Sequence, residues 1–229
     1  MTGNKMSSGM RGGFVAILRK LPSLFFGLFL FAAGIVANLY SNLGMNPWGV
    51  LNVGLANYLP LTLGQVSQLI GLLVIVLGWL LGIAPGLGTL ANMYFVGYFM
   101  DLIISWRLIQ VPSGFVWQLV SLFLSIVLLG VGSFFYLRVQ LGAGPRDGLM
   151  LGLVKMLGRS VWIVRCAMES TVLLLGYMLG GPVGIGTVAT ALTVGYSVQL
   201  AFRVGRFDSK SPQANLYDVY RLLTGKKVP

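Results

Sequence analysis

Long apolar stretches separated by short polar breaks run along most of the chain. An α-helix needs about 20 apolar residues to cross the hydrocarbon core of a membrane. Stretches near that length cover about residues 24–41, 62–83, 88–106, 114–137, 161–180 and 184–202. The pattern therefore predicts an all-α, polytopic membrane protein with six transmembrane helices.

Two shorter apolar segments, Pro47–Leu59 and Pro145–Leu157, follow the first and fourth of these stretches. At a rise of 1.5 Å per residue, each segment covers only about 20 Å, which is too short to cross the membrane. Each begins with proline, which suits the first position of a helix, and glycines before it favour a bend. We expect two half-helices that are either re-entrant or lie in the membrane interface.

An internal repeat relates the two halves of the chain. A shift of 98 positions places Leu43–Pro47 on Leu141–Pro145 and Gly86–Thr89 on Gly184–Thr187 without a gap. A constant offset of this kind indicates a duplicated unit. Each copy contains three predicted spans and one half-helix.

Composition supports the membrane assignment. Hydrophobic residues make up 56% of the chain, charged residues 9%, and the mean hydropathy is +0.86. A soluble domain is about 25% charged, because its surface meets water. This composition excludes a soluble enzyme, a nucleic-acid-binding domain and a disordered chain. The net charge of +11 is explained by basic residues that fix orientation in the membrane.

The distribution of charge predicts the topology. The connection 42–61 carries no charged residue, whereas 138–165 carries five basic residues, and only Arg107 of the sixteen basic residues falls on the outer side. Lys and Arg favour the cytoplasmic side, so both termini are predicted to be cytoplasmic and the second repeat inverted. The chain is predicted to consist, in order, of a cytoplasmic N-terminal segment 1–22, a first repeat 23–107, a second repeat 113–203 and a cytoplasmic tail 204–229.

The tail contains one further amphipathic segment. Ser211 and Pro212 resemble the start of a helix, and Gly225 resembles its end. Between these positions, one helical face carries the apolar residues Leu216, Val219, Tyr220 and Leu223. A short helix on the membrane surface and an ordinary solvated tail remain equal alternatives.

Catalytic chemistry is poorly represented. The chain has no histidine, five acidic residues and a single cysteine, Cys166, so it lacks His-based catalysis and an internal disulfide. No Walker A motif is present. We expect a protein that is not an enzyme and holds no metal or cofactor.

The glycine-rich motifs resemble those of a known family. Leu43–Trp48, Gly86–Thr89, Gly142–Met150 and Gly180–Thr187 are similar to the YczE-like family of bacterial integral membrane proteins, with the YitT-type group as a more distant relative. The resemblance covers roughly residues 22–202, and Gly144–Gly148 is its most specific part. It implies a bacterial inner-membrane location and a transporter-like protein, without an activity or catalytic residues to carry over.

The half-helix starts and nearby charges are the candidate site. Backbone amides at a helix N-terminus favour an anionic group, and broken helices in inverted repeats recur at transporter sites. Glu169 is a carboxylate within a span, and Arg165, four residues earlier, can pair with it. Candidate substrate-binding residues are Asn46, Pro47, Gly142, Gly144, Pro145, Arg146, Asp147, Arg165 and Glu169.

Structural explanations remain open for each of these features. The Gly-Pro segments can simply turn a loop, Arg146 and Asp147 can complement the helix dipole, and Arg165 and Glu169 can form a structural ion pair. Asp101, near the outer end of its span, is interpreted as an interfacial charge.

The sequence favours a small secondary transporter of a small polar or anionic metabolite in the bacterial inner membrane. The alternatives are a membrane accessory subunit that docks a partner protein, and a lipid-headgroup binder or flippase. The expected partners are membrane lipids and a small-molecule substrate, with no nucleic acid and with homo-oligomerisation left open.

Overall fold

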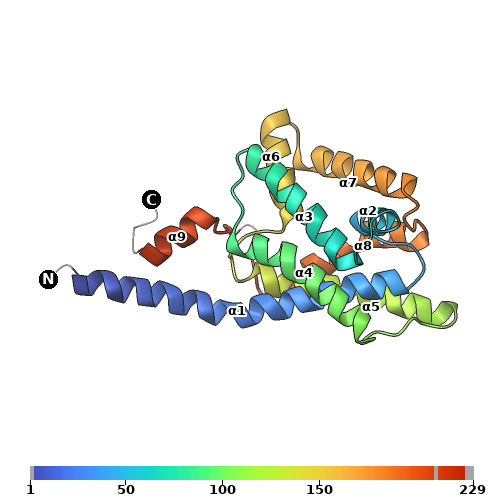
Figure 1. The fold of residues 1–229 in the computed structure, drawn as a ribbon, viewed down its shortest axis with the longest axis horizontal. Coiled ribbons are helices and arrows are strands. Elements are labelled where there is room, and N and C mark those ends of the chain that lie inside the picture. The colour runs from blue at the N-terminus through green and yellow to red at the C-terminus, as the bar shows by residue number, and fades with distance from the viewer. Residues whose placement is uncertain (1–2, 209–210, 225–229) are drawn as a thin grey trace.

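The computed structural model describes residues 3–208 and 211–224, and over these residues the protein is helical with no strand (Figure 1). Its helices are α1 (Gly3–Tyr40), α2 (Pro47–Ala56), α3 (Leu63–Leu80), α4 (Leu87–Ser105), α5 (Phe115–Leu137), α6 (Pro145–Leu157), α7 (Val161–Met178), α8 (Ile185–Val204) and α9 (Leu216–Thr224). Six of them are long and apolar enough to cross a membrane, namely α1 over Phe14–Tyr40, α3, α4, α5, α7 and α8. The six predicted spans are thereby confirmed.

The two predicted half-helices are also present. α2 has 10 residues and α6 has 13, and both carry proline at the first helical position. α2 ends at Ala56, earlier than the predicted Leu59. Helix α1 is longer than the apolar run from Leu24, because it continues through Pro22 back to Gly3 and thus includes most of the predicted N-terminal segment 1–22.

The helix boundaries follow the sequence repeat. The starts of α2 and α6, of α3 and α7, and of α4 and α8 are each separated by 98 positions. The first turns of α1 and helix α9 lie at the same end of the molecule (Figure 1).

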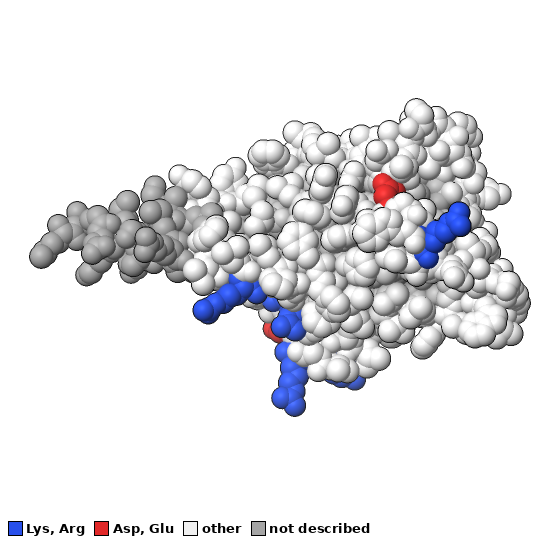
Figure 2. Space-filling model, turned by 60° about the horizontal axis from the view of Figure 1, so that its bottom comes forward, with Lys and Arg blue, Asp and Glu red and all other residues white. Residues whose placement is uncertain are grey.

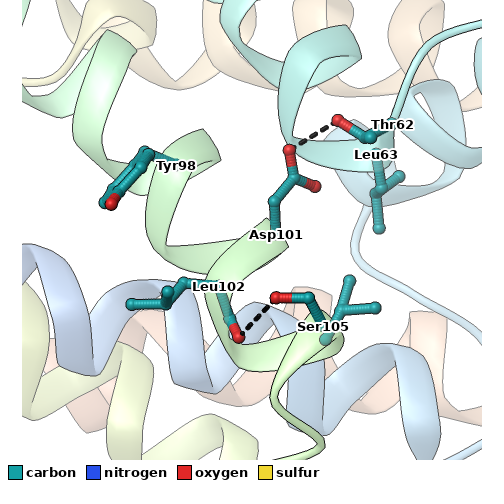
Figure 3. Close-up of a pocket in the computed structure, with 7 residues that line it drawn as sticks. Thr62, Leu63, Tyr98, Asp101, Leu102 and Ser105 are labelled. Carbon is teal, nitrogen blue, oxygen red and sulfur yellow. Dashed lines mark hydrogen bonds between the residues drawn. The ribbon is translucent and has the colours of Figure 1, made fainter.

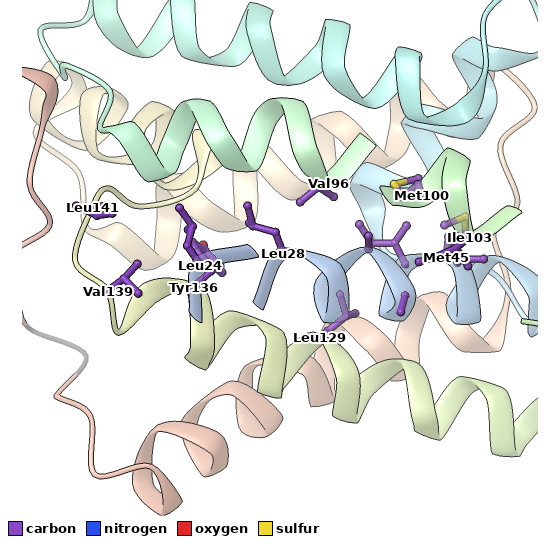
Figure 4. Close-up of a cluster of buried hydrophobic side chains, with 14 of the residues drawn as sticks. Leu24, Leu28, Met45, Val96, Met100, Ile103, Leu129, Tyr136, Val139 and Leu141 are labelled. Atoms are coloured by element: carbon purple, nitrogen blue, oxygen red, sulfur yellow. The ribbon is translucent and has the colours of Figure 1, made fainter. Parts of the chain in front are cut away.

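The core forms around α1, which lies between α4 and α5 (Figure 4). Leu24, Leu28 and Val36 on α1 are fully or almost fully buried against Met100 of α4 and Leu129 of α5. Small residues allow α1 and α5 to approach closely: a Cβ placed on Gly27 would lie 2.9 Å from the carbonyl oxygen of Gly132. This is the small-residue packing common between helices in membranes.

Backbone hydrogen bonds join the two halves in a reciprocal manner. The Gly88 amide at the start of α4 donates to the Leu141 carbonyl before α6, at 2.6 Å. The Gly186 amide at the start of α8 donates to the Leu43 carbonyl before α2, also at 2.6 Å. These are the same contact in the two repeats, since both pairs of positions differ by 98. The loop before each half-helix is therefore fastened to the other half of the molecule.

The C-terminal helix differs from its sequence-based prediction. It starts at Leu216 and not near Ser211, because Asn215 and Asp218 cap its first turn with reciprocal side-chain bonds of 3.0 Å each. It packs against α1, with Val219 buried and Tyr220 exposed. The predicted end at Gly225 and the side chain of Leu223 lie outside the described residues.

Candidate functional site

The loops that lead into the half-helices are held by equivalent positions of α1 and α5. Asn38 of α1 is fully buried, accepts from the Asn46 amide at 3.2 Å and donates to the Gly44 carbonyl at 3.3 Å. Its counterpart 98 residues later is Tyr136 of α5. A Cβ on Gly144 would lie 3.1 Å from the Tyr136 hydroxyl, so this residue holds the second loop.

The starts of α2 and α6 meet through side chains. The Arg146 guanidinium lies over the Trp48 ring, 4.6 Å from its centroid. Trp48 is almost completely buried and Arg146 half-buried. A cation over an aromatic face is attracted by the ring quadrupole, by about 2 kcal/mol or more when both groups are desolvated. The two residues occupy the same position in the two repeats, so the halves meet at this contact.

Glu169 joins the same cluster from α7. The Trp48 indole nitrogen donates to the Glu169 carboxylate at 3.1 Å. Within the described part of the chain, no ion pair connects Glu169 with Arg165, so the i,i+4 pairing that the sequence allowed is not formed. Arg165 is exposed on α7, and its charge acts on both Arg146 and Asp147.

Asp147 completes the charged cluster. Its carboxylate oxygen would lie 3.5 Å from a Cβ on Gly144, on the same side as the Tyr136 hydroxyl. Burial raises the pKa of the Asp147 carboxyl above its ordinary value, and the attraction of Arg165 and Arg146 opposes this only partly. Burial likewise lowers the pKa of the Arg146 guanidinium, against the attraction of Glu169 and Asp147.

The structure thus brings Arg146, Asp147, Arg165 and Glu169 together, and it gives other predicted residues structural roles. The Asn46 side chain caps α2 by accepting from the Gly49 amide at 3.0 Å. Gly142 has a φ of +128° and lies against Thr89 and Gly86, within the joint between the halves. Pro47 and Pro145 begin the half-helices, and both are buried.

The sequence did not identify Trp48 and Tyr136 as residues of the site. The repeat contains a usable signal, because Trp48 aligns with Arg146 and Tyr136 aligns with the buried amide Asn38. Their contacts, however, link segments far apart in sequence, such as 121 positions between Trp48 and Glu169.

Asp101 belongs to a separate feature, where the end of α4 meets the start of α3 (Figure 3). Its carboxylate accepts from the Thr62 hydroxyl at 2.5 Å and from the Gly64 amide at 2.9 Å, and thus caps the start of α3. A pocket of about 530 Å³ lies beside it, with mostly apolar walls that include Tyr98 and Leu102. Asp101, which the sequence suggested to be an interfacial charge, thus also has a structural role, because a carboxylate at a helix N-terminus stabilises the helix.

Metal-ligating side chains do not gather in the described residues: no group of three or more His, Cys, Asp or Glu forms there.

Comparisons with known proteins match the whole membrane region. The family of unknown function DUF6198 matches residues 18–203. An uncharacterized protein of Haemophilus influenzae is 35% identical over 81% of this chain and 84% of its own length. The uncharacterized membrane protein YczE of Bacillus subtilis is 35% identical over 75% of this chain and 80% of its own length. The uncharacterized protein YyaS of the same organism is 28% identical over 72% of this chain and 83% of its own length. No solved structure matches the chain.

Proposed function

The chain belongs to the DUF6198 family, whose function is unknown, and we propose that it is a small secondary carrier in the bacterial inner membrane. The observation that carries this proposal is the contact between Trp48 and Arg146. Because these residues are equivalent in the two repeats, a contact between them lies on the axis that relates the halves. Carriers built from inverted repeats bind substrate at such a place, near the bilayer midplane and beside broken helices.

An inverted arrangement of the repeats is part of the proposal. Each repeat has three spans, so a chain that crosses six times returns both termini to one side, in agreement with the first turns of α1 and helix α9 at one end of the molecule in Figure 1. Figure 2 shows that most Lys and Arg side chains visible on this face gather on the part of the helix bundle nearer the chain ends. Both features support cytoplasmic termini under the positive-inside rule.

The charged cluster indicates the substrate class. The starts of α2 and α6 present helix dipoles whose positive ends favour an anionic group. Arg165 is exposed and makes no ion pair among the described residues, so its guanidinium is available to a ligand carboxylate or phosphate. Asp147 and Glu169 balance the two arginines, which limits the net charge that the site accepts. A small polar or anionic metabolite fits this balance.

Solute uptake into liposomes tests the proposal. The purified protein would be reconstituted and supplied with radiolabelled amino acids, mono- and dicarboxylates and phosphate. We expect uptake of at least one solute, and a loss of at least about tenfold in Arg165→Gln, since a charge-assisted hydrogen bond contributes about 1.5–3 kcal/mol. Arg159→Gln removes another exposed arginine, in the turn before α7, and should leave uptake unchanged.

The same liposomes separate the alternatives. A protein that moves none of these solutes but exchanges fluorescent phospholipids between leaflets would be a flippase, and the carrier proposal would be rejected. A protein that moves neither would point to the accessory-subunit alternative.

A further inference from the structure

The described spans and half-helices form two groups according to their packing. α1, α4, α5 and α8 pack on one another and are here called the frame helices. α2 packs on α7 and on α3, and α6 packs on α3 and on α7; these four are called the half-helix group. Trp48, Arg146, Asp147, Arg165 and Glu169 all belong to the half-helix group. The main packing between the two groups is that of α3 on α4.

The α3–α4 interface is close and specific. Gly64 and Gly97 bring the two backbones into contact, with no room for a Cβ on either residue. A Cβ on Gly71 would lie 2.9 Å from the Met93 side chain. The Gln68 amide donates to the Tyr94 carbonyl at 2.8 Å. In the first repeat, the third helix is thus firmly packed on the fourth.

The equivalent helices of the second repeat hardly touch each other. α7 and α8 do not share the packing of α3 and α4, although they correspond to them at the offset of 98. Gly195, the counterpart of Gly97, has nothing in the described structure within 4 Å of a Cβ. Trp162 and Leu192, the counterparts of Gly64 and Tyr94, are 74% and 65% exposed. The second repeat therefore lacks a contact that the first one makes.

We propose that the protein has a second conformation in which the half-helix group rocks against the frame helices, so that α7 packs on α8 and α3 separates from α4. The two repeats exchange their arrangements in this motion, as expected of halves with equivalent helices. The inference deepens the proposed function, since a cluster held by the half-helix group would be exposed to each side of the membrane in turn.

Gly195 supports this second conformation. Glycine within a helix costs about 1 kcal/mol relative to alanine, and here no neighbour requires its small size. In a closed α7–α8 interface, Gly195 would lie opposite Trp162, and the indole would cover it. Large and small residues would then interlock where the first repeat has two glycines.

The joints around α7 allow such a motion. Gly158 before α7 and Gly180 after it have positive φ values of 61° and 76°, and glycine absorbs backbone rotation at little cost. α2 moves with α7, because Gly54 lies against the Gly176 carbonyl oxygen, which would be 2.7 Å from a Cβ.

Thiol crosslinking tests the inference with one substitution. Cys166 is the counterpart of Gln68, so Leu192→Cys creates on α7 and α8 the pair that Gln68 and Tyr94 make on α3 and α4. A short bifunctional thiol reagent, applied to membranes, should bridge this pair within one chain, as read from the intact mass. An irreversible bridge accumulates even a minor conformation. Leu192→Cys combined with Cys166→Ala is the control and should show no bridge.

A matched pair reports the other conformation. Gln68→Cys with Tyr94→Cys, in a Cys166→Ala background, should be bridged readily. When all four cysteines are present, molecules that carry both bridges should be at least tenfold rarer than the two single yields predict.

The inference is overturned if the α7–α8 pair stays unbridged while the α3–α4 pair is bridged, if both bridges occur together freely, or if Leu192→Cys links two chains. The same experiments test the second conformation and the carrier proposal separately. Mutually exclusive bridges without any solute uptake would retain the motion and reject transport. Uptake by molecules that carry both bridges would retain transport and reject the motion.

Discussion

Trp48 is the residue on which the charged cluster depends. Its ring lies beneath the Arg146 guanidinium, and its indole nitrogen donates to Glu169. A single buried side chain therefore contacts both a cation and an anion that come from the other half of the chain. Loss of the ring would leave two partly buried charges without their neighbour, which is costly in a region of low dielectric constant.

The variant Glu169→Gln tests whether the carboxylate has a role in transport. Glutamine retains an oxygen that can accept from Trp48, so we expect a folded protein with a melting temperature close to that of the wild type. If the carboxylate exchanges a proton during transport, uptake by the variant should lose its dependence on pH, because the glutamine amide carries no titrating proton. Uptake with an unchanged pH profile would show that Glu169 has a structural role only.

Asp147 is expected to reduce stability at neutral pH. Since burial raises its pKa, the native state holds a proton that the unfolded state has lost, and the free energy of unfolding falls as pH rises from about 4 towards the native pKa. Asp147→Asn should remove this fall and raise the melting temperature at pH 7 by a few degrees. Asp101→Ala should lower it instead, because it removes the cap of α3. Parallel pH profiles for Asp147→Asn and the wild type would contradict the assignment.

At this scale the sequence identified the charged residues but not their partners. The spacing of Arg165 and Glu169 allowed a pair on one helical face, and the structure connects Glu169 with Trp48 instead. Spacing along one helix reports local proximity only. A competing partner 121 positions away depends on how α2 packs against α7.

Among the helices, hydrophobic periodicity and the repeat predicted most of what is observed. The six spans and both half-helices lie where the apolar runs and the two prolines indicated. The continuation of α1 through Pro22 and the start of α9 at Leu216 were not predicted. Proline usually interrupts a helix, and a Ser-Pro pair often begins one, but both rules are only general preferences. At α9 the reciprocal cap formed by Asn215 and Asp218 sets the start of the helix instead.

Substitution of Gly44 tests the contact between the two repeats. This residue has a φ of +100°, and a Cβ there would meet the backbone of Gly184 and, at 2.7 Å, the Thr187 hydroxyl. Gly44→Ala should destabilise the protein by several kcal/mol, the sum of backbone strain and a clash that separates the halves. Gly114 has a φ of +88° and nothing in the described structure within 4 Å, so Gly114→Ala measures the strain alone, about 1–2 kcal/mol. Equal losses in thermal unfolding of the two variants would show that the joint tolerates separation.

For the whole molecule, the proposed topology rests on the distribution of basic residues along the chain. In a Cys166→Ala background, an impermeant thiol reagent should label Arg159→Cys only from the cytoplasmic side and Asn57→Cys only from outside. Both positions are exposed in turns next to α7 and α2. Labelling of position 159 from outside would reject the inverted repeats and, with them, a site on the axis between the halves.

Access to the charged cluster from both sides is the most direct test of a carrier with a central site. Glu169→Cys, in the same Cys166→Ala background, places one thiol beside Trp48. The impermeant reagent would be applied to right-side-out and to inside-out vesicles, with Arg159→Cys and Asn57→Cys as one-sided controls. We predict labelling of position 169 from both sides, and slower labelling from both when a transported solute is added. Labelling from one side only, with the controls behaving as expected, would contradict alternating access to this site.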